Sequence, residues 1–238
     1  MLHLARLPFP LLARFLARRP GPRKTLPAVV GAALFALVAG CSQPPAAPVE
    51  SRARLAPAPT PQSVCSVELY GDSILHGGYL GDRRLKEPPA DALRRLRPRY
   101  RVVDRSVNGE TAGTRSASFA SEERSGRIVV IQYGLNDAMQ GLPLETSLRA
   151  MVARARAEGR HVVLTGLSRT LVGADVRDRG DAAVRRVARD LAVPFADWGS
   201  VPVRPAEMAD ILHPAQAYSA RLVEHLVRVL DTVAPECV

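Results

Sequence analysis

The stretch Val67-Glu-Leu-Tyr-Gly-Asp-Ser-Ile-Leu-His76 decides how the rest of the chain is interpreted. Its apolar start is typical of a buried strand, and Gly71-Asp72 ends that strand so that Ser73 lies at a turn from strand to helix. In open α/β sheets, ligands bind outside the carboxyl ends of the strands. A helix N-terminus at that point also favours negative charge. Ser73 is therefore a candidate nucleophile, although Gly-Asp-Ser by itself also occurs in ordinary turns.

The chain beyond this stretch alternates between short apolar runs and segments with helical spacing. Strands that alternate with helices of this length imply right-handed crossovers and a parallel sheet with helices on both faces. The sequence therefore predicts an α/β fold, a three-layer α/β/α sandwich, and leaves the strand order open. The predicted strands are 66–70, 100–106, 127–133, 161–166 and 193–197, and the clearest helical faces lie within 144–155, 184–191 and 222–233.

Three later stretches supply the partners that a serine nucleophile needs. Gly109 follows the second predicted strand, where a glycine lets its backbone N–H approach a ligand closely. Asn136, in Gly-Leu-Asn-Asp after the third strand, offers a side-chain amide to an oxyanion. In Asp210-Ile-Leu-His213, the spacing of three lets the carboxylate orient one imidazole nitrogen while the other faces a serine. Each stretch alone is equally typical of a loop or a helix cap.

Other polar residues at the same rim are weaker candidates. Asp72 and Asp137 are interpreted as residues that order turns or cap helices. Asp197 ends the fifth predicted strand and is the main rival to Asp210 as the carboxylate that orients the histidine. His76 lies one turn beyond Ser73 and is a candidate pocket residue. His161 and His225 are interpreted as structural or surface residues.

Taken together, these motifs resemble the SGNH (GDSL-type) hydrolase superfamily, and most closely its bacterial thioesterase/lysophospholipase/arylesterase branch. The resemblance rests on Gly71-Asp72-Ser73, Gly109, Gly134-x-Asn136-Asp137 and Asp210-x-x-His213, in that order along the chain. It implies a flavodoxin-like sheet of five parallel strands. It also implies a serine esterase that cleaves carboxylic esters or thioesters through an acyl-enzyme intermediate, without a metal or other cofactor.

By this resemblance, Ser73, His213 and Asp210 form the catalytic triad, and the N–H groups of Ser73 and Gly109 hold the oxyanion together with the Asn136 side chain. Two other functions stay open. One is a carbohydrate O-acetylesterase, and the other is an inactive envelope lipoprotein that serves as a binding module. The sequence leaves acyl length, leaving group and oligomeric state undetermined.

The basic excess of the chain comes from its first 40 residues. The whole sequence of 238 residues carries a formal net charge of +10, yet residues 1–40 hold six basic and no acidic residues. The remaining +4 is ordinary, and no basic run interleaved with aromatic residues argues for nucleic-acid binding. Residues 26–40 form an apolar run too short to span a bilayer comfortably, which is typical of a signal peptide.

The junction Val38-Ala-Gly-Cys41 resembles a bacterial lipobox, and the alternative is a plain signal peptide. The resemblance implies that Cys41 is lipidated as the mature N-terminus, and Ser42 after it resembles the signal for sorting to the outer membrane. We therefore expect a lipoprotein signal peptide over 1–40, a Pro/Ala-rich tether over 41–64 and a hydrolase domain over 65–238, lipid-anchored in the bacterial envelope.

The two remaining cysteines, Cys65 and Cys237, are predicted to form a disulfide, the alternative being two free thiols. An exported protein meets an oxidising compartment, and the count without Cys41 is even. Cys65 opens the first strand at the amino edge of the sheet. A final helix starting near Pro214 and running back from His213 is long enough to bring Cys237 to the same edge.

Overall fold

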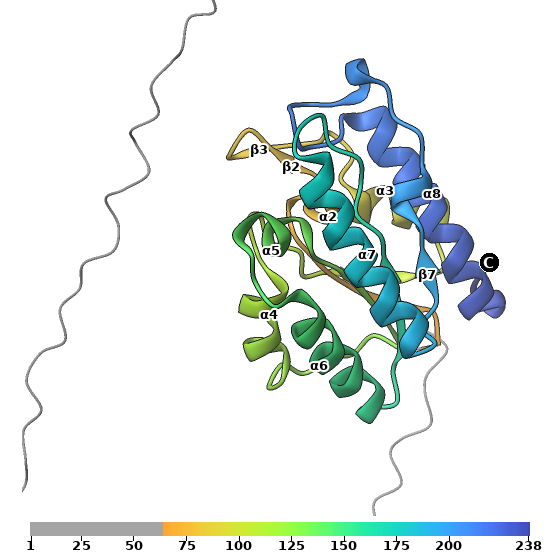
Figure 1. The fold of residues 1–238 in the computed structure, drawn as a ribbon. Coiled ribbons are helices and arrows are strands. Elements are labelled where there is room, and N and C mark those ends of the chain that lie inside the picture. The colour runs from red at the N-terminus through yellow and green to blue at the C-terminus, as the bar shows by residue number, and fades with distance from the viewer. Residues whose placement is uncertain (1–63) are drawn as a thin grey trace, which may run out of the picture. The chain divides into compact units, whose positions relative to one another are not determined.

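The computed structural model describes residues 64–238, which form a sheet of five strands in which every neighbouring pair is parallel (Figure 1). The predicted fold is therefore confirmed. In spatial order the strands are β4 (Arg101–Asp104), β1 (Ser66–Gly71), β5 (Ile128–Gln132), β6 (His161–Thr165) and β7 (Phe195–Ala196). After β1, the chain forms β4 on one side of β1 and then β5 on the other side, so the strand order reverses at β1. In open α/β sheets, ligands bind in the crevice at the point of this reversal.

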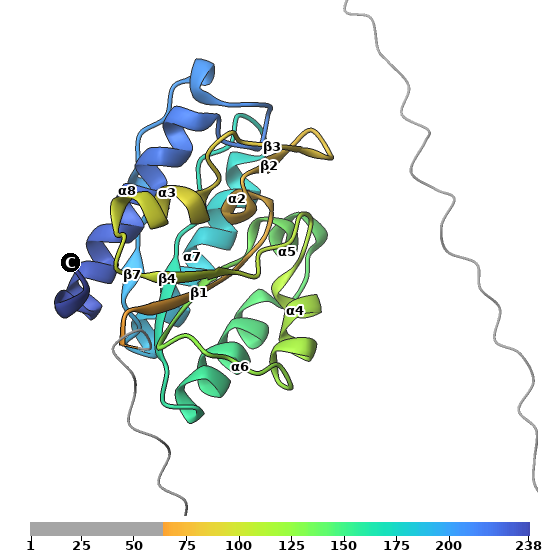
Figure 2. The same ribbon diagram turned by 180° about the vertical axis from the view of Figure 1, so that it is seen from behind.

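Helices cover both faces of the sheet, as the two opposite views show (Figures 1 and 2). Side chains alternate along each strand, so Val67 and Leu69 of β1 enter one apolar core while Tyr70 enters the other. One core is closed by α2 (Ser73–His76), α3 (Pro89–Leu96) and α8 (Gln216–Val233). The other is closed by α4 (Ala112–Phe119), α5 (Leu135–Gln140), α6 (Leu144–Ala157) and α7 (Ala174–Asp190).

Short elements complete the domain and explain where the last strand and the final helix differ from their predicted boundaries. The last strand is shorter than predicted because the Asp197 carboxylate accepts from Ser200 N–H at 3.1 Å and turns the chain into a 3₁₀ helix. The final helix starts two residues after Pro214, which pairs with Met208 in an isolated bridge. The remaining elements are β2 (Gly78–Tyr79), β3 (Arg83–Arg84), η1 (Trp198–Ser200), η2 (Pro205–Glu207) and η3 (Pro235–Cys237).

A charged side chain lies inside β1, which is paired on both sides. Glu68 is fully buried, and its carboxylate accepts from the N–H groups of Ser125 and Gly126 at 2.6 and 2.8 Å and from Arg105 at 2.9 Å. Burial alone would raise the pKa of Glu68, but these bonds outweigh it and hold the pKa below its ordinary value. The buried charge therefore ties β1 to the segment that precedes β5.

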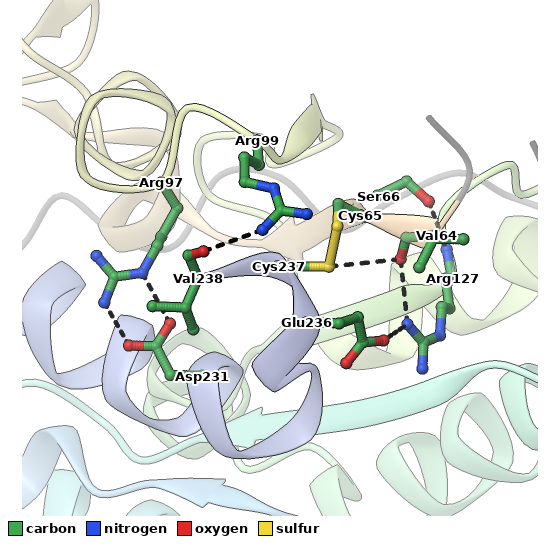
Figure 3. Close-up of a disulfide and its surroundings, with 10 residues drawn as sticks. All are labelled: Val64, Cys65, Ser66, Arg97, Arg99, Arg127, Asp231, Glu236, Cys237 and Val238. Carbon is green, nitrogen blue, oxygen red and sulfur yellow. Dashed lines mark hydrogen bonds and ion pairs between the residues drawn. A yellow bond between two sulfur atoms is a disulfide. The ribbon is translucent and has the colours of Figure 1, made fainter. Parts of the chain in front are cut away.

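Cys65 and Cys237 form the predicted disulfide at the edge of the sheet where β1 begins (Figure 3). Their Cα atoms are 5.5 Å apart, and Cys237 lies in η3 immediately after α8. Beside the disulfide, Arg127 bonds the carbonyl of Val64 at 3.3 Å and pairs with Glu236. The two ends of the domain are thus fastened together far from the carboxyl ends of the strands.

Replacing both Cys65 and Cys237 with alanine should lower the free energy of unfolding by about 5 kcal/mol, because the bond closes a loop of 172 residues. This is the value that the chain-entropy model gives for a loop of this length. Urea unfolding with and without reductant measures the effect. Reductant should not shift the midpoint of the alanine variant any further. A midpoint of urea unfolding that is the same for wild type with and without reductant would contradict the prediction.

Several predictions concern the chain before this domain. The signal peptide over 1–40, the lipidation of Cys41 and the tether, apart from its last residue, lie outside the described residues. Within residues 64–238, no helix combines the length and the apolar character that crossing a bilayer requires.

Candidate active site

Ser73 is presented by a tight connection between strand β1, which lies between β4 and β5, and the short helix α2. The Asp72 carboxylate caps α2 by accepting from Ile74 N–H at 2.9 Å. The Gln132 side-chain oxygen, on neighbouring β5, accepts from the N–H groups of Asp72 and Leu75, both at 3.2 Å. A Cβ atom on Gly71 would lie 2.8 Å from that same oxygen, so only glycine fits there. These contacts fix Ser73 at the carboxyl end of the sheet.

His213 and Asp210 reach Ser73 from the loop that precedes α8. Ser73 Oγ lies 2.9 Å from His213 Nε2. His213 Nδ1 lies 2.9 and 2.8 Å from the two oxygens of Asp210. The His213 and Asp210 side chains are only 20% and 15% exposed. Serine, imidazole and carboxylate therefore stand in one hydrogen-bonded line, which is the arrangement that activates a serine nucleophile.

The Asp210 carboxylate is held ionised by several donors. Oδ1 accepts from the N–H groups of Leu212 and His213, both at 2.8 Å, and Oδ2 accepts from Leu80 N–H at 3.2 Å. Burial alone would raise the pKa of Asp210, but these bonds and the imidazole outweigh it and lower the pKa below its ordinary value. A carboxylate that stays charged beside His213 fixes the tautomer and stabilises an imidazolium.

The predicted oxyanion donors line the same hollow, which has a volume of about 310 Å³ and contains Ser73, Gly109, Asn136 and His213. Gly109 has a φ of +73°, a backbone conformation that favours glycine. Within residues 64–238, neither Ser73 N–H nor Gly109 N–H donates to a protein acceptor. Asn136 Nδ2 donates to the Glu110 carbonyl at 2.9 Å, which orients the amide and leaves its second N–H available.

The weaker candidates lie elsewhere. Asp197 pairs with Arg185 and bonds no atom of His213. His76 Nδ1 bonds Ser106 Oγ at 3.3 Å, and His76 does not line the catalytic hollow. Asp137 caps α4 rather than its own helix, since it accepts from Ala112 N–H at 3.1 Å. His161 is exposed at the start of β6, at the amino edge of the sheet, and His225 bonds Arg228 on α8.

Sequence reasoning missed three residues that support the site. Gln132 holds the turn at Ser73, and Leu80 donates to Asp210. Glu110 is the third, and its side chain accepts from Tyr133 at 2.6 Å and from Arg115 at 2.9 Å. The contacts of Gln132 and Leu80 join segments distant in sequence, and no local motif marks these roles. The one available signal was a polar residue, Gln132, at the end of an otherwise apolar strand.

The Asp72 carboxylate, next to the nucleophile in sequence, lies where its charge is disfavoured. It is 1% exposed, and burial raises its pKa to about 7. The bonds from Ile74 and Gln132 oppose this rise, while the negative charges of Asp137 and Glu110 add to it. Since the folded pKa exceeds the unfolded value near 3.9, Asp72 contributes stability at low pH that is lost as the pH rises toward 7.

Asp72→Asn should therefore become more stable relative to wild type as the pH rises from about 4 to about 7, because asparagine can cap α2 but cannot ionise. Urea unfolding at a series of pH values measures the difference in free energy. Asp82→Asn, a change on the exposed turn between β2 and β3, is the control and should show no such trend. A difference between Asp72→Asn and wild type that stays constant with pH would refute the assignment.

Comparisons with known proteins identify the family. The sequence model of the GDSL-like lipase/acylhydrolase family matches residues 69–221. The esterase TesA of Pseudomonas aeruginosa is 33% identical over 139 residues, which cover 53% of this chain and 68% of that protein. A crystal structure of TesA superposes with a TM-score of 0.59 at 27% identity, covering 71% of this chain and 99% of that one.

A more distant structure shows the same fold. It is the psychrotrophic esterase EstA from a Pseudoalteromonas species, with a TM-score of 0.60 at 17% identity, covering 71% of this chain and 98% of that one. The family match begins within the strand before Ser73 and extends beyond His213. The chain therefore belongs to the GDSL-like lipase/acylhydrolase family and is an ester-hydrolysing enzyme.

Proposed function

We propose that this chain is a serine esterase that cleaves carboxylic ester or thioester bonds, with Ser73 as nucleophile, His213 as general base and acid, and Asp210 as the orienting carboxylate. The observation that carries the proposal is the continuous hydrogen-bonded line from Ser73 Oγ through the imidazole to Asp210. It lies beside two backbone N–H groups and an amide that can receive an oxyanion.

In the proposed reaction, Ser73 Oγ attacks the carbonyl carbon while its proton passes to His213 Nε2. The tetrahedral intermediate collapses, the bond to the leaving oxygen or sulfur breaks, and His213 gives the proton to the leaving atom. A water molecule, deprotonated by His213, then attacks the acyl group on Ser73. Collapse of the second intermediate returns the proton to Ser73 and releases the carboxylic acid.

Asn136→Ala should lower kcat by about 10²–10³, because it removes one oxyanion donor that acts mainly in the transition state. Steady-state kinetics on a short-chain 4-nitrophenyl ester measure the loss. Gln140→Ala changes an exposed amide on the same helix and should leave kcat unchanged. A folded Asn136→Ala enzyme with kcat within threefold of wild type would exclude Asn136 from the oxyanion site.

The apolar character of the rim favours acyl groups longer than acetyl. Six large apolar side chains exposed in residues 64–238 lie in the segments that follow the carboxyl ends of β4, β5, β6 and β7, one of them within α5. They are Val107, Met139, Leu142, Leu171, Val172 and Ile211. An ester panel with acyl chains of two to twelve carbons, run beside acetylated sugars, tests this preference. Activity confined to acetylated sugars would instead favour a carbohydrate O-acetylesterase, and a folded protein inactive on all of them would favour a binding module.

We also infer that the protein is an exported lipoprotein, anchored in the bacterial envelope through Cys41, which lies outside the described residues. The disulfide between Cys65 and Cys237 supports export, because such bonds persist in oxidising compartments. Metabolic labelling with palmitate should mark the wild-type protein and not Cys41→Ala. Unchanged labelling of the variant would rule out lipidation at Cys41.

A further inference from the structure

A second, larger hollow lies next to the catalytic one. Its volume is about 810 Å³, and it opens between the β2–β3 hairpin with the segment after it and the loop that carries Asp210 and His213. Tyr79 lines both hollows, so they adjoin at that side chain. We refer to the larger hollow as the hairpin groove.

The walls of the hairpin groove are fixed by hydrogen bonds. Gln216 at the start of α8 bonds both the N–H and the carbonyl of Glu87, at 3.1 and 2.9 Å. Ala209 N–H donates to the His213 carbonyl at 2.8 Å. Leu80, another lining residue, donates its N–H to Asp210. The groove is therefore built onto the residues that carry and orient the imidazole.

The reaction determines which part of a substrate lies on this side. The carbonyl oxygen must point toward Gly109 and Asn136, whereas the leaving atom must face His213, because the imidazole protonates it. Ala209, Ala215 and Gln216, which line the groove, flank the stretch from Asp210 to His213 on both sides. The hairpin groove is thus in the position to receive the group that departs, and not the acyl chain.

The charge of the groove is positive and uncompensated. Arg83 and Lys86 line it, and within residues 64–238 neither side chain forms an ion pair or a hydrogen bond. Glu87 is the acidic residue of the lining, and its carboxylate is engaged by Arg95 at 2.5 and 3.1 Å. Two free cations beside Tyr79 and Leu80 suit a leaving group with an apolar part and an acidic group.

We propose that the hairpin groove is a leaving-group site that selects substrates whose alcohol or thiol carries an anionic group, a carboxylate or a phosphate, through Arg83 and Lys86. This inference rests on the proposed serine esterase reaction and names the kind of leaving group that the same site prefers. Tyr79 and Leu80 supply the apolar contact, and the two cations raise the local concentration of the anionic substrate.

A matched pair of chromogenic esters tests the proposal. One is 2-nitrophenyl butanoate and the other is 3-butanoyloxy-4-nitrobenzoic acid, which adds a carboxylate to the same kind of leaving group. The measured quantity is the ratio of kcat/KM for the anionic ester to that for the neutral ester. The double change Arg83→Gln/Lys86→Gln should lower this ratio by about fivefold to tenfold, the size expected for two exposed ion pairs.

The control variants separate local charge from net charge. Arg156→Gln/Arg189→Gln removes the same two charges from α6 and α7 and should leave the ratio unchanged. Arg83→Lys/Lys86→Arg keeps the charges and should retain the wild-type ratio. In wild type, the preference for the anionic ester should fall as salt rises from about 0.02 to 0.5 M, since exposed charges are screened.

The outcomes distinguish this inference from the proposed function. Loss of preference in Arg83→Gln/Lys86→Gln alone, with a wild-type ratio that depends on salt, supports the leaving-group site. An equal loss in Arg83→Gln/Lys86→Gln and Arg156→Gln/Arg189→Gln, or a wild-type ratio that does not change with salt, overturns it while the esterase assignment stands. Absence of hydrolysis of either ester by wild type would count against the proposed reaction itself. An acyl glycerol 3-phosphate and a phosphate-bearing thioester then distinguish lipid from thioester sources of the anion.

Discussion

Ser73→Ala and His213→Ala should each lower kcat for ester hydrolysis by about 10⁴–10⁶ while leaving the fold intact. Ser73 supplies the oxygen that forms the acyl-enzyme, and His213 removes its proton across the 2.9 Å bond. Removing the serine or the histidine alone from a catalytic triad lowers kcat nearly as much as removing all three residues, since they act as a unit. Steady-state assays, with protein purified free of host esterases, measure the loss.

The controls for these two variants lie outside the relay. Ser121→Ala changes an exposed serine after α4, and His225→Ala changes a partly exposed histidine on α8. Both should keep wild-type kcat within about twofold. Circular dichroism should show that Ser73→Ala is folded, because the cap of α2 comes from Asp72 and not from Ser73. A folded Ser73→Ala protein with a near-wild-type rate would remove Ser73 from the mechanism.

Asp210→Asn should lower kcat by about 10⁴, because an amide would hold the imidazole in the wrong tautomer and could not stabilise its charged form. The structure places Asp210 within 2.8 Å of His213 Nδ1, and the variant keeps an oxygen for the Leu212 and His213 N–H groups. The free energy of activation should therefore rise by more than the free energy of unfolding falls. Assays of kcat beside urea unfolding of the same preparation separate the two effects.

Asp197→Asn is the matched comparison for Asp210→Asn. It breaks an ion pair with Arg185, whose side chain is 40% exposed, and such pairs contribute little to stability. We expect activity within about threefold of wild type. A larger loss of kcat in Asp197→Asn than in Asp210→Asn would transfer the orienting role to Asp197.

The fold and the candidate relay were accessible to sequence reasoning for a common physical reason. Strands buried under helices on both faces read as apolar runs, which is how β5 and β6 stand out, whereas the run in β1 is interrupted by Glu68. Asp210 and His213 lie three residues apart in one loop, so their contact is local. Ser73 is marked by the break after the apolar run, and the direction of a parallel sheet brings these loops to one rim.

The parts that escaped prediction depend on contacts that no local pattern encodes. The β2–β3 hairpin has only two residues in each strand, too few to show alternation, and its Leu80 has a φ of +45°. Helix α4 has the sequence Ala-Gly-Thr-Arg-Ser-Ala-Ser-Phe, with low helical propensity. It is stabilised at its start by the Thr111 side chain and by Asp137 from helix α5.

Labelling with a fluorophosphonate, followed by peptide mapping, is the most direct test of the central claim that Ser73 is an activated nucleophile. These reagents phosphonylate serines whose proton is removed by a neighbouring base. We expect one modified peptide, carrying the label on Ser73, with no labelling of Ser73→Ala and strongly slowed labelling of His213→Ala. Labelling of another residue, or equal labelling of wild type and Ser73→Ala, would contradict it.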